Sequence, residues 1–64
     1  MKLNRDKVEM AMCQRKMSQS DIAKLLDVST QAVNGYLRRC DKVMEKTIGK
    51  LADALQVEID EIIE

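Results

Sequence analysis

The feature that most constrains the fold is a helix-start signal that occurs twice, at residues 17–22 and again at 28–33. Ser18 is placed to cap the first of these helices, and Asp21 completes a variant capping box three residues later. Ser29 is placed in the same way for the second helix. In both ranges the two end residues are apolar and have the spacing of a hydrophobic staple. The two helices are separated by only about three residues, so we expect them to cross steeply.

The rest of the chain also predicts helices, because it has no proline and only two glycines, which leaves few turn signals. A first helix is expected from Asn4 to near Lys16, a fourth over 47–55, and a short fifth near the C-terminus. The predicted core consists of the apolar residues that recur at helical spacing: Val8, Ala11, Met12, Cys13, Ile22, Ala23, Leu25, Leu26, Ala32, Val33, Tyr36, Leu37, Cys40, Ile48, Leu51, Ala52 and Leu55. We therefore expect an all-α fold, a compact five-helix bundle that forms one domain over residues 1–64.

The composition argues against an enzyme. Histidine is absent and Cys13 and Cys40 are the only cysteines, so one chain cannot assemble a four-ligand zinc site or a Cys/His nucleophile. No glycine-rich phosphate loop is present either. We expect no catalytic residue, no metal and no cofactor, and we interpret both cysteines as small buried side chains. No apolar run approaches the roughly 20 residues that cross a bilayer, so a soluble cytoplasmic protein without membrane contact is expected.

The charge is distributed unevenly although the formal net charge is zero. Residues 1–42 contain nine basic and five acidic side chains, whereas residues 43–64 contain two basic and six acidic ones. The first part of the chain is therefore suited to face an anion, and the second is not.

The third expected helix, at about 30–39, separates its two faces cleanly. Its apolar residues form a buried stripe, and the opposite face contains Thr30, Gln31, Asn34, Gly35, Arg38 and Arg39. A glycine inside a helix costs about 1 kcal/mol relative to alanine, so Gly35 suggests the close approach of another surface. Short polar side chains near a helix N-terminus are suited to reading DNA bases, since Gln31 can bind adenine with two hydrogen bonds and Thr30 can contact a base or a thymine methyl.

Residues 19–38 resemble the helix-turn-helix of the phage-repressor and Cro-like family, also called the XRE type. The resemblance rests on Gln19, Ile22, Ala23, Leu26, Val28, Val33 and Tyr36 at their spacings, and the segment from Ile48 to Ile63 resembles the closing helices of that family. It implies a lambda-repressor-like fold with the helix-turn-helix at the second and third helices. It also implies a bacterial or phage regulator of transcription, a repressor by expectation, that acts in the cytoplasm on nucleoid DNA.

The resemblance implies that the third helix enters the major groove while the second lies across the backbone. The expected base-reading residues are Thr30, Gln31, Asn34 and Gly35, where the missing side chain of Gly35 either admits closer docking or removes a contact. The expected phosphate-binding residues are Gln19, Ser29, Arg38, Arg39 and Lys42. The small basic excess predicts modest affinity per subunit, which favours a homodimer on a palindromic operator, assembled through the C-terminal helices with Ile59, Ile62 and Ile63.

The sequence departs from the family pattern at three places. Lys16 and Asp27 stand where glycine is common, a departure that concerns a small backbone strain rather than the fold, and Asp27 can tolerate a left-handed backbone. Met12 and Leu37 stand where many members have a buried Arg–Glu pair, and we hypothesise that these two apolar side chains pack together.

Each functional interpretation has a structural alternative. The basic pair at residues 38–39 could serve only to complement the dipole of its helix, and Gln19, Ser18 and Ser29 are explained by helix capping with or without DNA. Ile62 and Ile63 could close the core of the monomer and leave no dimer surface. The alternative function is a protein-interaction module, similar to an antitoxin or antirepressor, that uses the same fold without DNA.

Overall fold

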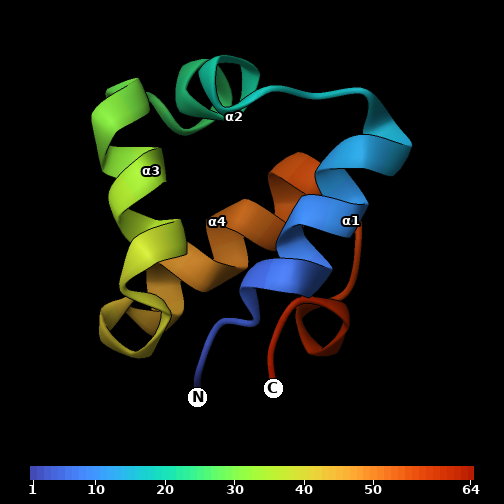
Figure 1. The fold of residues 1–64 in the computed structure, drawn as a ribbon, viewed down its shortest axis with the longest axis vertical. Helices are drawn as coiled ribbons and strands as arrows, with labels where there is room; N and C mark the ends of the chain where they lie inside the picture. The colour runs from blue at the N-terminus through green and yellow to red at the C-terminus, as the bar shows by residue number, and fades with distance from the viewer.

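The computed structural model describes all 64 residues and contains four α-helices and two short 3-10 helices. The order is α1 (Arg5–Arg15), α2 (Gln19–Leu26), α3 (Thr30–Arg38), η1 (Cys40–Lys42), α4 (Glu45–Leu55) and η2 (Ile59–Glu61). The expected all-α fold is confirmed, but the expected count of five helices is wrong. In Figure 1, α4 lies in the middle, α1 and α3 lie on either side of it, and α2 closes the end opposite the two termini.

Three helices begin where the capping residues predict. The side-chain oxygen of Asn4 accepts a hydrogen bond from the Lys7 amide at 3.1 Å, and the hydroxyl of Ser29 accepts one from the Ala32 amide at 3.1 Å. At α2 the capping box is complete, because the Ser18 hydroxyl accepts from the Asp21 amide and the Asp21 carboxylate accepts from the Ser18 amide. These bonds satisfy amides that the first turn of a helix leaves without partners.

Three helices end in a left-handed residue that is not glycine. Lys16, Asp27 and Gln56 have φ values of 55°, 58° and 58° and close α1, α2 and α4. The first two are the expected departures from the family pattern, whereas nothing in the sequence indicates the third. A side chain in this conformation costs about 1–2 kcal/mol, because Cβ approaches the following carbonyl oxygen.

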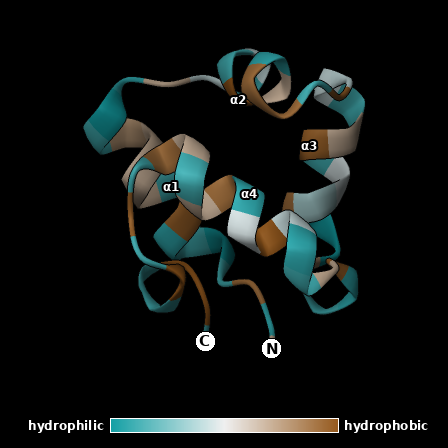
Figure 2. Cartoon of the chain, turned by 180° about the vertical axis from the view of Figure 1, so that it is seen from behind, coloured by the Kyte–Doolittle hydropathy of each residue, from teal (hydrophilic) through white to brown (hydrophobic).

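One core holds the fold together, and it is formed by thirteen buried apolar residues. Every helix except the 3-10 turns contributes to it, and Met12 and Leu37 are both members, with exposed fractions of 9% and 4%. Figure 2 shows the hydrophobic segments gathered around the middle of the molecule. Several core predictions are wrong: Cys13 is exposed because it lies opposite the buried stripe of α1, Leu25 is 62% exposed at the edge of the stripe of α2, and Cys40 is only half-buried.

The C-terminal segment does not form the expected fifth helix. The chain makes the single 3-10 turn η2 and then runs extended, so that Ile63 pairs with Leu3 in an antiparallel bridge. The Asn4 amide donates to the Ile62 carbonyl at 2.8 Å, and the Glu64 amide donates to the Lys2 carbonyl at 2.9 Å. This pairing satisfies backbone groups of both termini, which lie side by side in Figure 1, and it leaves Ile62 fully buried.

Candidate nucleic-acid interface

Helix α3 presents a polar face that no other part of the chain covers. Val33 and Leu37 are 1% and 4% exposed and anchor the helix in the core, and the strong segregation of apolar residues fixes its rotation. Gln31 lies on the opposite side, and Thr30, Gln31 and Asn34 are all exposed. The uncovered polar face that the sequence predicts is therefore confirmed.

The polar face continues onto the N-terminus of α2. One shallow depression spans the two helices, and none of its lining residues is hydrophobic. It is lined by Gln19, Thr30, Gln31, Asn34 and Arg38. The Asn34 side-chain amide donates to the Gln19 side-chain oxygen at 3.5 Å, which links the two helices across it. Because the turn at Asp27 brings α2 and α3 close together, residues 15 positions apart in the sequence share one surface.

Four of the predicted site residues lie outside this depression. Three of them are exposed: Ser29 at the N-cap of α3, Arg39 at its C-cap, and Lys42 in η1. The Ser29 hydroxyl already accepts the capping bond, so its structural role is established independently of DNA. Gly35 is half-buried on the same side of α3 as Asn34 and Arg38, and a Cβ placed on it would have no neighbouring atom within 4 Å.

The basic side chains differ in their hydrogen-bond partners, and two of them donate to backbone carbonyls. Arg15 donates to the carbonyls of Leu55 and Gln56 at 3.1 and 3.3 Å, and Lys7 donates to the carbonyl of Ile63 at 3.0 Å. These two cations bind the C-terminal half of the chain, where the last carbonyls of α4 lack helical partners. Sequence reasoning missed both contacts, since they join residues 40 to 56 positions apart.

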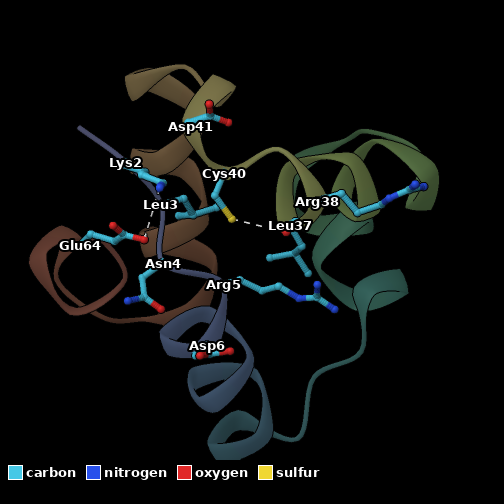
Figure 3. Close-up of a pocket in the computed structure, with 10 residues that line it drawn as sticks. All are labelled: Lys2, Leu3, Asn4, Arg5, Asp6, Leu37, Arg38, Cys40, Asp41 and Glu64. Carbon is cyan, nitrogen blue, oxygen red and sulfur yellow. Dashed lines mark hydrogen bonds and ion pairs between the residues drawn. The ribbon is translucent and has the colours of Figure 1, made fainter.

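The cationic side chains at and just after the C-terminal end of α3 have no hydrogen-bond partner within the chain. Arg38, Arg39 and Lys42 make no ion pair and no side-chain hydrogen bond, so their donors are available to an incoming anion. Arg38 also lines a second depression, which is lined by Arg5 of α1 as well (Figure 3). Arg5 was not singled out from the sequence, because nothing local connects it with a helix that begins 25 residues later.

One carboxyl near the interface has a shifted pKa. The backbone amide of Ser18, and secondarily its hydroxyl, donate hydrogen bonds that hold the pKa of Asp21 below its ordinary value of 3.8. The effect belongs to the capping box, which keeps the start of α2 and hence Gln19 in place.

The described residues contain no group of three or more His, Cys, Asp or Glu side chains placed to hold a metal ion. None of the helices combines the length and the apolar character needed to cross a membrane.

Comparison with known proteins identifies the family. A family model described as helix-turn-helix matches residues 8–62, which is most of the chain and includes α2, α3 and α4. Searches of curated proteins and of solved structures give no significant match. The order of the helices, the short left-handed turn at Asp27 and the polar face of α3 agree with this match. The chain therefore belongs to the XRE-type helix-turn-helix family of DNA-binding transcription regulators.

Proposed function

We propose that the protein binds double-stranded DNA sequence-specifically and represses transcription, with α3 lying in the major groove. The observation that carries the proposal is the all-polar depression shared by the exposed face of α3 and the N-terminus of α2. A recognition helix needs such a face, because base edges in the groove are read by hydrogen bonds from its first turns.

Base reading is assigned to Thr30, Gln31 and Asn34. Gln31 is exposed and free of side-chain hydrogen bonds, so both ends of its amide are available to an adenine. Asn34 is held by Gln19, and this bond restricts its orientation before DNA arrives. Gly35 lets the groove approach the helix closely, because it adds no side chain to this face.

Phosphate binding is assigned to Gln19, Ser29, Arg38, Arg39 and Lys42. The last three are the unpaired cations at the end of α3, and they would give a salt slope of roughly −3 per subunit at about −0.9 per phosphate. The amides at the starts of α2 and α3 lie next to Gln19 and Ser29 and favour an anion.

Such modest electrostatics favour two subunits on a palindromic operator, with half-sites about 34 Å apart. The predicted dimer surface is smaller than the sequence suggests, since Ile62 is fully buried and Ile63 is half-buried in the monomer. Ile59 is 39% exposed and is the isoleucine of this segment that remains for a contact between C-terminal segments. Sedimentation with and without the selected duplex would measure the subunit number.

Selection from random duplexes, followed by affinity measurements at several salt concentrations, tests the proposal. Gln31→Ala should relax the preference at one base pair by about 1–3 kcal/mol, while Arg38→Ala should weaken binding to all sequences alike. Gln14→Ala changes an exposed glutamine of α1 outside the depression and is the matched control. Absence of binding to every duplex would reject DNA binding and favour the protein-interaction module.

A further inference from the structure

The polar depression of the proposed DNA interface does not end at the recognition helix. Arg38 lines it and also lines a second depression, which lies between the C-terminal end of α3 and the start of α1. Arg5, the first residue of α1, belongs to this second depression. A duplex that contacts Arg38 would therefore also lie close to this second depression. Whether the second depression attracts DNA phosphates depends on the charges that line it.

The charges of the second depression are equal in number but separated in space. Its lining contains three basic and three acidic side chains. Lys2 and Glu64 form an ion pair at 3.7 Å and largely cancel each other. In Figure 3 the guanidinium groups of Arg5 and Arg38 extend to the same side, past Leu37, whereas Asp41 and Glu64 lie away from that side. The side that continues the polar depression therefore offers the guanidinium donors of Arg5 and Arg38, with the Glu9 carboxylate beside the first of them.

Arg5 is positioned by an ion pair that leaves it accessible. Its Nε lies 3.2 Å from a carboxylate oxygen of Glu9, one turn along α1, and the two side chains are 59% and 47% exposed. An exposed pair of this kind contributes little to stability but limits the rotamers of the arginine. The bond uses Nε, so the two terminal nitrogens of the guanidinium remain free to donate to a phosphate, whose oxygens suit a planar fork of donors.

We propose that Arg5 is a further DNA-binding residue: it contacts a backbone phosphate that flanks the base pairs read by α3, on the side of the C-terminal end of that helix. The proposal rests on the proposed function and deepens it, because it extends the footprint of each subunit from α3 to α1. The contact carries no base preference. Glu9 opposes it electrostatically, since its carboxylate lies next to the same phosphate.

The test compares Arg5→Gln, Glu9→Gln and Lys50→Gln on the duplex selected by the wild-type protein, with affinity measured by fluorescence anisotropy over a range of salt. Lys50 is an exposed lysine of α4 outside both depressions, so Lys50→Gln controls for the loss of one charge. Per bound subunit, Arg5→Gln should weaken binding about five- to tenfold and lower the salt slope by about one, while Lys50→Gln should change affinity by less than about twofold. Glu9→Gln should bind more tightly than wild type.

A second measurement locates the contact and does not depend on the stability of the variant. Duplexes are shortened in steps from either flank, and each is titrated with wild type and with Arg5→Gln. On duplexes that carry a single half-site, removal of the outer phosphates on one flank only should abolish the difference between the two proteins. Equal effects of Arg5→Gln and Lys50→Gln, or a difference that survives trimming of both flanks, would overturn the assignment of Arg5 and leave the proposed function intact. Failure of the wild type to bind any duplex would reject both.

Discussion

Replacing Gly35 by alanine separates the needs of the fold from the needs of the interface. Gly35 lies inside α3, and Gly49 lies inside α4, and a Cβ added to either would have no neighbouring atom within 4 Å. The folded monomer therefore has room for alanine at both positions. Packing thus requires glycine at neither position, and DNA binding can distinguish Gly35, which lies on the exposed face of α3, from Gly49.

The expected stability change is the same for Gly35→Ala and Gly49→Ala. Alanine is favoured over glycine inside a helix by about 0.5–1 kcal/mol, because glycine loses more backbone freedom on folding. For a domain of this size, 1 kcal/mol shifts Tm by about 4–8 °C, so each variant should melt about 2–8 °C higher than wild type. Circular dichroism measures this shift, and a decrease in Tm for either variant would refute the claim of open space.

The expected effects on DNA binding differ. Gly35 lies on the face of α3 that carries Asn34 and Arg38, so an added methyl would separate the helix from the groove. By analogy with overpacking of a close contact, affinity should fall by about 1–3 kcal/mol for Gly35→Ala and remain unchanged for Gly49→Ala. If both variants gain stability and both bind the selected duplex like wild type, then Gly35 is not a point of close approach.

The helix ends and the core allow three more tests. Gln56→Gly relieves a left-handed backbone that costs about 1–2 kcal/mol, but the greater backbone entropy of unfolded glycine opposes this gain by about 0.5–1 kcal/mol. The free energy of unfolding measured by urea denaturation should therefore rise by about 0.5–1 kcal/mol. A decrease in this free energy would contradict the assigned strain. Because the Ser18 hydrogen bonds lower the pKa of Asp21, its carboxylate stabilises the folded state above the ordinary pKa of 3.8, and this stability disappears as the pH falls through the lowered pKa. Asp21→Asn should therefore reduce Tm near pH 7 but not at strongly acidic pH. An equal reduction of Tm at both pH values would be inconsistent with this cause. Met12→Arg and Leu37→Glu should each lower the free energy of unfolding by about 3–5 kcal/mol, because each buries an unpaired charge. The double variant should recover much of this loss. Additive losses in denaturation experiments would show that the two residues do not interact.

Features with local causes could be predicted from the sequence. The caps at Asn4, Ser18 and Ser29 are correct because donor and acceptor lie three residues apart. The left-handed end at Asp27 could be anticipated from the sequence, and the family pattern marked Lys16 as a position where glycine is common, but nothing marked Gln56, since glutamine has no preference for that conformation.

Errors arose where one pattern fits two structures. The isoleucines at 59, 62 and 63 have helical spacing, yet the same residues serve a 3-10 turn followed by an extended end, and the deciding factor is the pairing partner Leu3 at the other end of the chain. At the interface, periodicity placed Gln31, Asn34 and Arg38 on one face, and the family resemblance added Gln19. The presence of Arg5 and Arg38 at one depression depends on how α1 packs, which no local signal encodes.

The formal net charge of zero is a poor guide to the interface, because screening makes charge a local property. At physiological ionic strength the Debye length is about 8 Å, so a phosphate responds to cations close to it and hardly to the acidic segment 58–64. The fold also engages donors of two cations, since Arg15 and Lys7 donate to carbonyls of the C-terminal half. The cations left unpaired at the end of α3 are few, so long-range attraction is weak and most discrimination must come from hydrogen bonds such as those of Gln31. Compared with a strongly basic binder, the protein should therefore lose less affinity as salt rises, which makes specificity less dependent on ionic strength.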